Sequence, residues 1–311
     1  MPISTFDIVI STAAAVILFI YALKGFSRDV RETGGEQLSN WIAKVTANPV
    51  KGFIRGALLT ALIQSSSAVS GITVALVEAG TILFRSSLPV FLGANLGTTS
   101  TAWLVSLDLT TLGPFLFVAS VLISWLPGRI SLAGRSVFYL GVILLALQLV
   151  SDAIAPIKEN ATLASWLAYE MYPILGLLIG IVGTALLQSS SVMVGLAIIA
   201  VQQGLLDTTD VVPIVVGSNL GTTSTALIAS ASVGLVARRA AIANFVFNAL
   251  GVLAFLPFMT VFARFVVDWV GDGDTTVATV HVLFNIGVAI IGAALLNRVA
   301  DWLAPENTAT A

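Results

Sequence analysis

One ten-residue stretch occurs twice in this chain, 124 residues apart and with a single difference, inside sequence that is otherwise almost entirely apolar. GANLGTTSTA runs from Gly93 to Ala102, and GSNLGTTSTA runs from Gly217 to Ala226. With a shift of 124 residues and no gaps, 21 of the 47 positions from Gly56 to Ala102 are identical, against roughly a tenth for unrelated apolar sequence. The chain therefore contains an internal duplication, and its fold must accommodate two related halves.

The sequence around these repeats is too apolar for a soluble domain. Hydrophobic residues make up 57% of the chain and charged residues 10%, and the mean hydropathy is +1.01, whereas soluble domains carry about 25% charge. The apolar runs are long enough to be membrane-spanning helices rather than barrel strands. We predict an all-α, multi-pass protein of the cell (inner or plasma) membrane.

Composition also excludes several classes of function. The chain has no cysteine and one histidine, which rules out disulfides, cysteine-ligated metals and histidine clusters. A formal net charge of −2 gives no sign of nucleic-acid binding. No pairing of acid, base or nucleophile lies within the apolar runs, so we do not expect an enzyme.

Two apolar runs, 52–82 and 174–205, differ from the others because each has Gln-Ser-Ser-Ser at its middle, starting at Gln64 and Gln188. The remaining long runs are predicted as membrane spans: 7–26, 88–106, 111–127, 134–153, 210–230, 238–260 and 277–297. The first is expected to be a retained helix, since no basic segment precedes it as in a signal peptide. Two segments with Trp among charged residues are predicted as interfacial helices: 36–47 and 160–171.

Each Gln-Ser-Ser-Ser run is either one span with a polar centre or a hairpin that enters and leaves on the same side. An arm of about 13 residues, roughly 20 Å of helix, reaches only the middle of a roughly 30 Å hydrocarbon core. Hairpins place twelve basic residues on one side against two, whereas continuous spans give ten against four, so the positive-inside rule favours hairpins. It puts the N-terminus outside and the C-terminus in the cytoplasm. The twelve are Lys24, Arg28, Arg31, Lys44, Lys51, Arg55, Arg85, Arg129, Arg135, Arg238, Arg239 and Arg298, and the two are Lys158 and Arg264.

These assignments predict three parts: inverted repeat 1 over 1–130, inverted repeat 2 over 131–262, and an extra transmembrane helix with a short C-terminal tail over 263–311. Each repeat has a re-entrant hairpin and a broken helix. Three crossings per repeat is an odd number, so the second copy is expected upside down, with the two Gln-Ser-Ser-Ser tips meeting near the midplane. Inverted repeats with broken helices are typical of secondary transporters.

A hairpin tip presents backbone N–H groups at the start of its outgoing helix, where partial positive charge attracts anions. Two such tips, with serine hydroxyls as further donors, predict a cradle for an oxyanion. The carboxamides of Gln64 and Gln188 could accept a hydrogen bond from hydrogen phosphate, which sulfate cannot offer. The predicted phosphate-binding residues are Gln64, Ser65, Ser66, Ser67, Gln188, Ser189, Ser190 and Ser191.

The repeated G-x-N-L-G-T-T motif lies in the span after each hairpin. Its glycines, Gly93, Gly97, Gly217 and Gly221, are expected to let the helix unwind. The carbonyls and the side-chain oxygens of Asn95, Thr98, Thr99, Asn219, Thr222 and Thr223 then suit Na+, because the set contains no carboxylate. No Lys or Arg is predicted at mid-membrane depth, so co-bound cations would have to balance a buried anion.

Small polar residues in membrane helices more often pack than bind, but here they recur as a set at one offset. The pairs Asn244 with Asn248 and His281 with Asn285 are better explained by interhelical hydrogen bonds. A proton relay through His281 is the alternative.

The paired QSSS runs, each followed by G-[AS]-N-L-G-T-T, resemble the sodium-dependent phosphate cotransporter family, the type II Na/Pi transporters and their bacterial relatives. The resemblance implies Na+-coupled movement of inorganic phosphate, with Na+ as coupling ion and substrate and ions near two inverted hairpin tips. It adds Gln64, Ser66, Gln188 and Ser190 to the predicted sodium ligands. An anion channel or uniporter, and a phosphate-binding sensor, remain alternative functions. A homodimer is one assembly that is compatible with the sequence.

Overall fold

The computed structural model describes residues 4–44, 48–128, 130–159, 172–230 and 234–304. Within these ranges the chain is helical and contains no strand, which confirms the predicted all-α class. The α-helices are α1 (Thr5–Ala43), α2 (Pro49–Ile63), α3 (Ser66–Glu78), α4 (Phe84–Ser106), α5 (Gly113–Ser124), α6 (Ile130–Ile154), α8 (Pro173–Leu187), α9 (Ser190–Gln202), α10 (Thr208–Ser230), α11 (Leu235–Phe255), α12 (Met259–Val270) and α13 (Asp274–Leu303). Short 3-10 turns are η1 (Leu109–Leu112), η2 (Ala155–Glu159) and η3 (Leu256–Phe258).

Several helix starts follow directly from the sequence. Ser4 caps α1 by accepting a hydrogen bond from the Asp7 amide, and Asn48 caps α2 in the same way. Pro49 and Pro173 occupy the first position of α2 and α8, where the missing N–H costs nothing. The first arms of the two hairpins, α2 and α8, therefore both start with proline.

Five helical segments in the described residues are long and apolar enough to cross a membrane, or six if one bent pair is counted as a span. The bent pair is α4 with η1 and α5, which turn by 83° where Asp108 adopts a left-handed conformation. The predicted span at 111–127 is thus the 12-residue α5, roughly 18 Å long and too short to cross alone. Five of the seven predicted spans coincide with these helices, and 88–106 and 111–127 together form the bent pair. The inverted relation of the halves stays a prediction.

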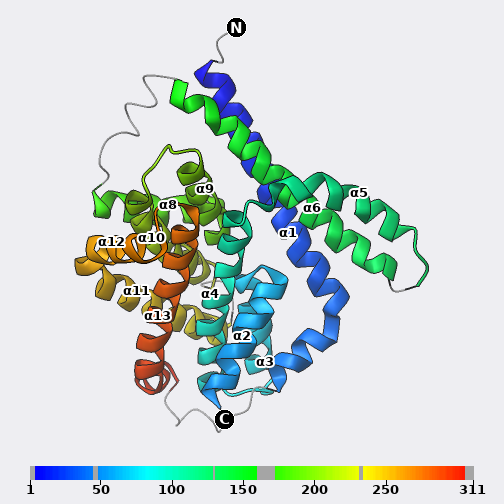
Figure 1. The fold of residues 1–311 in the computed structure, drawn as a ribbon. Helices are drawn as coiled ribbons and strands as arrows, with labels where there is room; N and C mark the ends of the chain where they lie inside the picture. Colours follow the sequence, from blue (N-terminus) through cyan, green and yellow to red (C-terminus); the bar gives the residue numbers. More distant parts are fainter. Residues whose placement is uncertain (1–3, 45–47, 129, 160–171, 231–233, 305–311) are drawn as a thin grey trace.

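The predicted interfacial helix at 36–47 is the last part of α1. Helix α1 includes Gly35, but the backbone of this residue is not helical, with φ of 43° and ψ of −128°, a conformation that favours glycine. The chain therefore kinks there and α1 turns back beside α2 and α3 (Figure 1). The other predicted interfacial helix, 160–171, lies outside the described residues.

The same close helix–helix contact, made by glycines, occurs once within each half of the chain. A Cβ at Gly56 of α2 would collide with the Val90 carbonyl of α4, and a Cβ at Gly93 with the Phe53 carbonyl. The same contacts join α8 to α10, shifted by 124 residues, at Gly180 with Ile214 and Gly217 with Leu177. The backbones touch only because these positions lack side chains, as in small-residue packing of membrane helices.

The glycines of the repeated motif therefore do not unwind their helices, and that expectation is wrong. Both α4 and α10 run unbroken through Gly93–Ala102 and Gly217–Ala226. A glycine can be required either for close approach to a neighbouring helix or for conformational freedom of the backbone. Here close approach to the neighbouring helix accounts for these glycines. Unwound carbonyls are consequently not available at this point as ion ligands.

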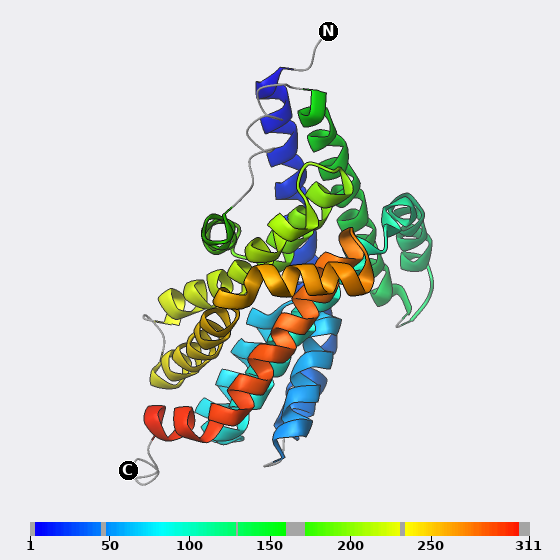
Figure 2. The same cartoon turned by 60° about the vertical axis from the view of Figure 1, so that its left-hand side comes forward.

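The arrangement places the two hairpins on different sides of a common core. Figure 1 shows α2 and α3 in the lower half of the view and α8 and α9 in the upper half, with α4 between them and α5 projecting away. In Figure 2, α12 crosses over α13. Phe19, Phe91, Phe247 and Phe284 are fully buried in the core, while many apolar side chains, such as Phe115, point outward, as expected of a surface in lipid.

Candidate functional site

Each Gln-Ser-Ser-Ser run breaks its apolar stretch into two helices. Gln64 ends α2 and Gln188 ends α8, both in the left-handed conformation, with φ of 59° and 56°. The next residue is extended and caps the outgoing helix: Ser65 Oγ accepts from the Ala68 amide at 3.2 Å. In the second copy Ser189 Oγ accepts from Val192 at 3.3 Å. A single continuous helix through either run is thereby excluded.

The caps satisfy one amide at each tip and leave others free. Among the described residues, the amides of Ser66 and Ser67 have no protein acceptor, and neither do those of Ser190 and Ser191. These N–H groups lie in the first turn of α3 and α9, where the helix dipole favours negative charge. The predicted donors for an oxyanion are therefore present at both tips.

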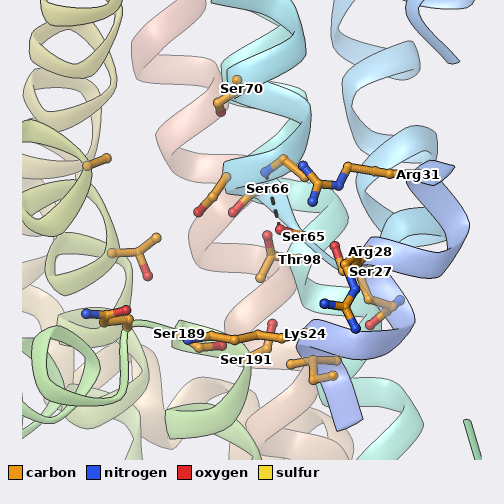
Figure 3. Close-up of a pocket in the computed structure, with 18 of the residues that line it drawn as sticks. Lys24, Ser27, Arg28, Arg31, Ser65, Ser66, Ser70, Thr98, Ser189 and Ser191 are labelled. Carbon is orange, nitrogen blue, oxygen red and sulfur yellow. Dashed lines mark hydrogen bonds between the residues drawn. The ribbon is translucent and has the colours of Figure 1, made fainter. Parts of the chain in front are cut away.

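Both tips line one open cavity of about 1340 Å3. Figure 3 shows its serines projecting from α3 and α9, with α1 on the other side. At roughly 30 Å3 for each molecule of liquid water, this volume holds dozens of waters, so a ligand at the tips would be reached from an aqueous vestibule. All eight predicted phosphate-binding residues lie in its lining: Gln64, Ser65, Ser66, Ser67, Gln188, Ser189, Ser190 and Ser191.

A chain of hydrogen bonds joins the first tip to the second through α4. Thr101 Oγ1 donates to Gln64 Oε1 at 2.6 Å, and it lies 3.2 Å from the Ser191 hydroxyl. The Gln64 Nε2 group donates to Ser100 Oγ at 2.9 Å and to the Ala61 carbonyl. Gln64 is therefore fixed on both its oxygen and its nitrogen.

Gln188 has no equivalent restraint. Its side chain is exposed to the cavity and makes no hydrogen bond within the part of the chain that the structure describes. Thr225, which corresponds to Thr101, donates instead to the Thr222 carbonyl of its own helix at 2.8 Å. Ser190 and Ser191 are buried, whereas Ser67 in the first tip is exposed.

Only part of the predicted sodium set reaches the cavity. Its lining contains Gln64, Ser66, Thr98, Gln188, Ser190 and Thr222. The others lie elsewhere on the same helices: Asn95, Thr99, Asn219 and Thr223. Thr99 and Thr223 donate to carbonyls of their own helices, as does the Asn219 amide, to Val215. Adjacent residues of a helix point about 100° apart, and here Thr98 lines the cavity whereas Thr99 does not.

The asparagine of the first motif pairs with another helix. Asn95 Nδ2 donates to Asn244 Oδ1 of α11 at 2.8 Å, and Asn248 Nδ2 donates to the Asn244 carbonyl at 2.9 Å. The predicted interhelical role of Asn244 is confirmed.

His281 is fully buried, with no hydrogen-bond partner for its ring nitrogens among the described residues. The Asn285 side chain donates to the His281 carbonyl within the same helix.

The absence of Lys and Arg at mid-membrane depth stays a prediction, but the cavity as a whole is not free of charge. Lys24, Arg28 and Arg31 of α1 line it and are labelled in Figure 3. The sequence places them beyond the first apolar run, and only the structure shows that α1 continues past them along the cavity wall. Fixed positive charge is therefore available to an anion inside it.

Three further residues near the tips were not predicted. Thr101 is the central link between the tips. It is part of the repeated decapeptide, so the repetition itself could have pointed to this residue. Thr60 and Thr184, 124 residues apart, are fully buried one turn before each tip, and their hydroxyls have no hydrogen-bond partner among the described residues. An unpaired buried hydroxyl is unusual, and its recurrence in both halves marks a shared feature of the tips.

Comparison with known proteins relates the chain to phosphate transporters. The family model for the Na+/Pi-cotransporter matches residues 18–152 and 157–298. YqeW of Bacillus subtilis, an uncharacterized protein, is 31% identical over 294 residues, covering 93% of this chain and 95% of YqeW. No solved structure matches the chain.

Two groups of relatives carry functional names. YjbB of Salmonella typhimurium, provisionally described as an inorganic phosphate export protein, is 27% identical over 276 residues, which are 88% of this chain and 51% of YjbB. The sodium-dependent phosphate transport protein 2A of Oryctolagus cuniculus is 36% identical over 92 residues, 29% of this chain and 14% of the relative. The chain thus spans about half the length of YjbB and matches a small part of the animal protein. The family that the chain matches is one of transporters rather than of enzymes.

Proposed function

Because the chain belongs to the Na+/Pi-cotransporter family, we propose that it carries inorganic phosphate across a membrane together with Na+, by alternating access. The observation that carries the proposal is the convergence of both Gln-Ser-Ser-Ser tips on one open cavity. Free amides at two helix N-termini and the unrestrained Gln188 carboxamide offer phosphate oxygens several donors on opposite sides.

Sodium would bind to oxygens that remain available as acceptors. The Thr98 hydroxyl donates its proton to the Ala94 carbonyl, and the Thr222 hydroxyl donates to the Ser218 carbonyl. The lone pairs of both hydroxyl oxygens are therefore free for a cation. The buried hydroxyls of Thr60 and Thr184 are two more such oxygens. Sets of neutral oxygens of this kind suit Na+ in transporters.

Alternating access requires a cavity closed on one side. Phe19 of α1 and Val105 of α4 are buried and lie next to Gly195 of α9, and none of these three residues lines the cavity. Lys24 and Arg28 line the cavity, and the positive-inside rule places these two residues on the cytoplasmic side. The proposed cycle moves the tips so that the Phe19 side opens and the basic side closes.

A uniporter or exporter of phosphate is the second candidate, and a specific observation favours it. Three fixed cations line the cavity, so co-bound sodium is not the sole means of balancing a phosphate dianion. A relative is also named for phosphate export. This candidate predicts phosphate flux without accumulation against a gradient.

The test is uptake of labelled phosphate by purified protein in liposomes. An inward Na+ gradient is expected to drive accumulation above equilibrium, whereas a K+ gradient is not, and excess unlabelled sulfate is expected to leave uptake unchanged. Equal uptake in Na+ and K+ with no accumulation would establish the uniporter instead. Absence of both phosphate flux and phosphate binding would refute the substrate.

A further inference from the structure

Three basic side chains form a stripe along the part of α1 that faces the cavity. Lys24, Arg28 and Arg31 are separated by four and three residues, so they lie on one face of the helix. All three line the cavity. Figure 3 shows them on α1, across the cavity from the tip serines of α3 and α9.

The neighbouring carboxylate on α1 points away from the cavity. Asp29 is 1% exposed, and its Oδ1 lies 3.0 Å from Arg135 Nε of α6. Its Oδ2 accepts a hydrogen bond from Ser136 at 2.6 Å. The acidic charge between Arg28 and Arg31 in the sequence is therefore neutralised on the opposite side of the helix.

The cations facing the cavity are poorly paired. Arg28 Nε lies 4.0 Å from Glu32 Oε1, and both side chains are exposed, so this pair contributes little. Lys24 and Arg31 have no ion pair in the described ranges. Among the described residues of the lining, Glu78 is the one acidic residue against three cations, which leaves a net charge of +2 in a chain whose formal charge is −2.

Basic residues after a first span also serve as a topology signal. Such a signal requires a side of the membrane but no particular face of a helix. Here all three cations line the cavity, whereas Asp29 does not line it and is paired with α6 instead. The orientation calls for an additional explanation, and an anionic ligand in the cavity supplies it.

We propose that Lys24, Arg28 and Arg31 form an outer anion site that captures inorganic phosphate at the cavity mouth before it reaches the hairpin tips. The inference rests on the proposed phosphate transport and adds a second, earlier site to it. Ammonium and guanidinium groups bind phosphate oxygens through charge-assisted hydrogen bonds, and a cleft lined by one sign of charge raises association rates by about 10- to 1000-fold. Because capture precedes translocation, the stripe sets the KM for phosphate rather than the maximal rate.

The chain has no cysteine, so each charge can be removed and restored in folded protein. Lys24→Cys and Arg31→Cys are made separately, reconstituted, and assayed for phosphate uptake before and after thiol modification. At low ionic strength each variant is expected to raise the KM about tenfold, with the maximal rate within about twofold of wild type. A cationic aminoethyl methanethiosulfonate restores most of the affinity, whereas the anionic sulfonatoethyl reagent raises the KM further. Added inert salt shrinks these differences, since it screens exposed charges.

Arg298→Cys is the matched control, because it removes an exposed cation of α13 that does not line the cavity. Its KM is expected to stay at the wild-type value with either reagent. Wild-type uptake is measured first, so failure of phosphate transport itself is recognised independently. If wild type transports phosphate and the KM of both cavity variants is the same with the cationic and the anionic reagent, the outer site does not exist.

A lipid headgroup presents the same phosphate chemistry, so each variant is compared in zwitterionic phosphatidylcholine and in vesicles with added phosphatidylglycerol. An outer site for free phosphate predicts the KM change in both lipids. A change confined to phosphatidylglycerol vesicles would assign the stripe to lipid and overturn the proposal.

Discussion

Gln64 and Gln188 end their helices with nearly the same left-handed backbone, with φ of 59° and 56°, yet their side chains meet different surroundings. Gln64 is held by Thr101 and Ser100, whereas Gln188 is exposed to the cavity and makes no hydrogen bond in the described residues. The serines show the reverse: Ser191 is buried and Ser67 is exposed. The duplication thus preserved the tip backbone while the surroundings diverged, so that the Gln64 side chain is anchored and the Gln188 side chain is not.

The glycine contacts offer the strongest test of what the halves share. Gly93→Leu and Gly217→Leu each force a side chain against a backbone carbonyl of the neighbouring helix. Overpacking usually costs about 1–3 kcal/mol, and main chain yields less than side chains, so each variant is expected to lose more than about 3 kcal/mol. The measurement is the yield of monodisperse protein and its thermal unfolding in detergent. Gly71→Leu is the control, since nothing lies within 4 Å of a Cβ there. A Gly217→Leu variant with wild-type thermal stability would show that the two halves are not equally packed.

The tip glutamines should separate function from stability. Gln188→Ala is expected to lower phosphate uptake about 10- to 100-fold, the loss of one hydrogen bond to a charged ligand, and to leave thermal stability unchanged. Gln64→Ala is expected to reduce uptake and also to destabilise the fold by about 1–3 kcal/mol, because it removes the hydrogen bonds that Gln64 makes with Thr101 and Ser100. Uptake in liposomes and thermal unfolding of the same preparations check both. Equal destabilisation by the two variants would abolish the distinction drawn here.

The linking threonine can be compared with its counterpart by an isosteric change. Thr101→Val removes the donor to Gln64 and the contact with Ser191, at an expected cost of about 1–2 kcal/mol. Thr225→Val removes only a bond to the Thr222 carbonyl of its own helix and should cost less than about 0.5 kcal/mol. Thermal unfolding of the two variants in one detergent decides this, and a larger loss for Thr225→Val would contradict the assignment.

Much of this fold follows from the sequence, for physical reasons that particular residues make plain. The arms beside Gln64 and Gln188 are too short to span a bilayer, so a break is expected there and is present. The duplication marks Gly93 and Gly217 as important, but sequence alone does not distinguish a glycine that frees the backbone from one that admits a neighbour. The bend after α4 depends on Asp108, whose left-handed conformation has no sequence pattern typical of it.

The candidate site was predictable only in part, because its asymmetry arises from tertiary contacts. Thr101 and Thr225 sit in identical local sequence, yet one reaches Gln64 and the other bonds its own helix. Likewise, hydropathy places Lys24 at the end of a span, and the cavity face of α1 becomes visible only when the helices are assembled. Which neighbour each copy meets therefore decides its role, and a duplicated sequence does not contain that information.

The asparagines of the two motifs give the smallest and most specific comparison. Asn95 bonds Asn244 across helices, whereas Asn219 bonds the Val215 carbonyl of its own helix. A double-mutant cycle of Asn95→Ala with Asn244→Ala is expected to give a coupling free energy of about 0.6 kcal/mol, the average for hydrogen bonds between membrane helices. The cycle of Asn219→Ala with Asn244→Ala should give none. Unfolding free energies measured in one detergent supply both cycles. Equal coupling in the two would mean that Asn219 also reaches α11 in solution and that the halves are more alike than their hydrogen bonds indicate.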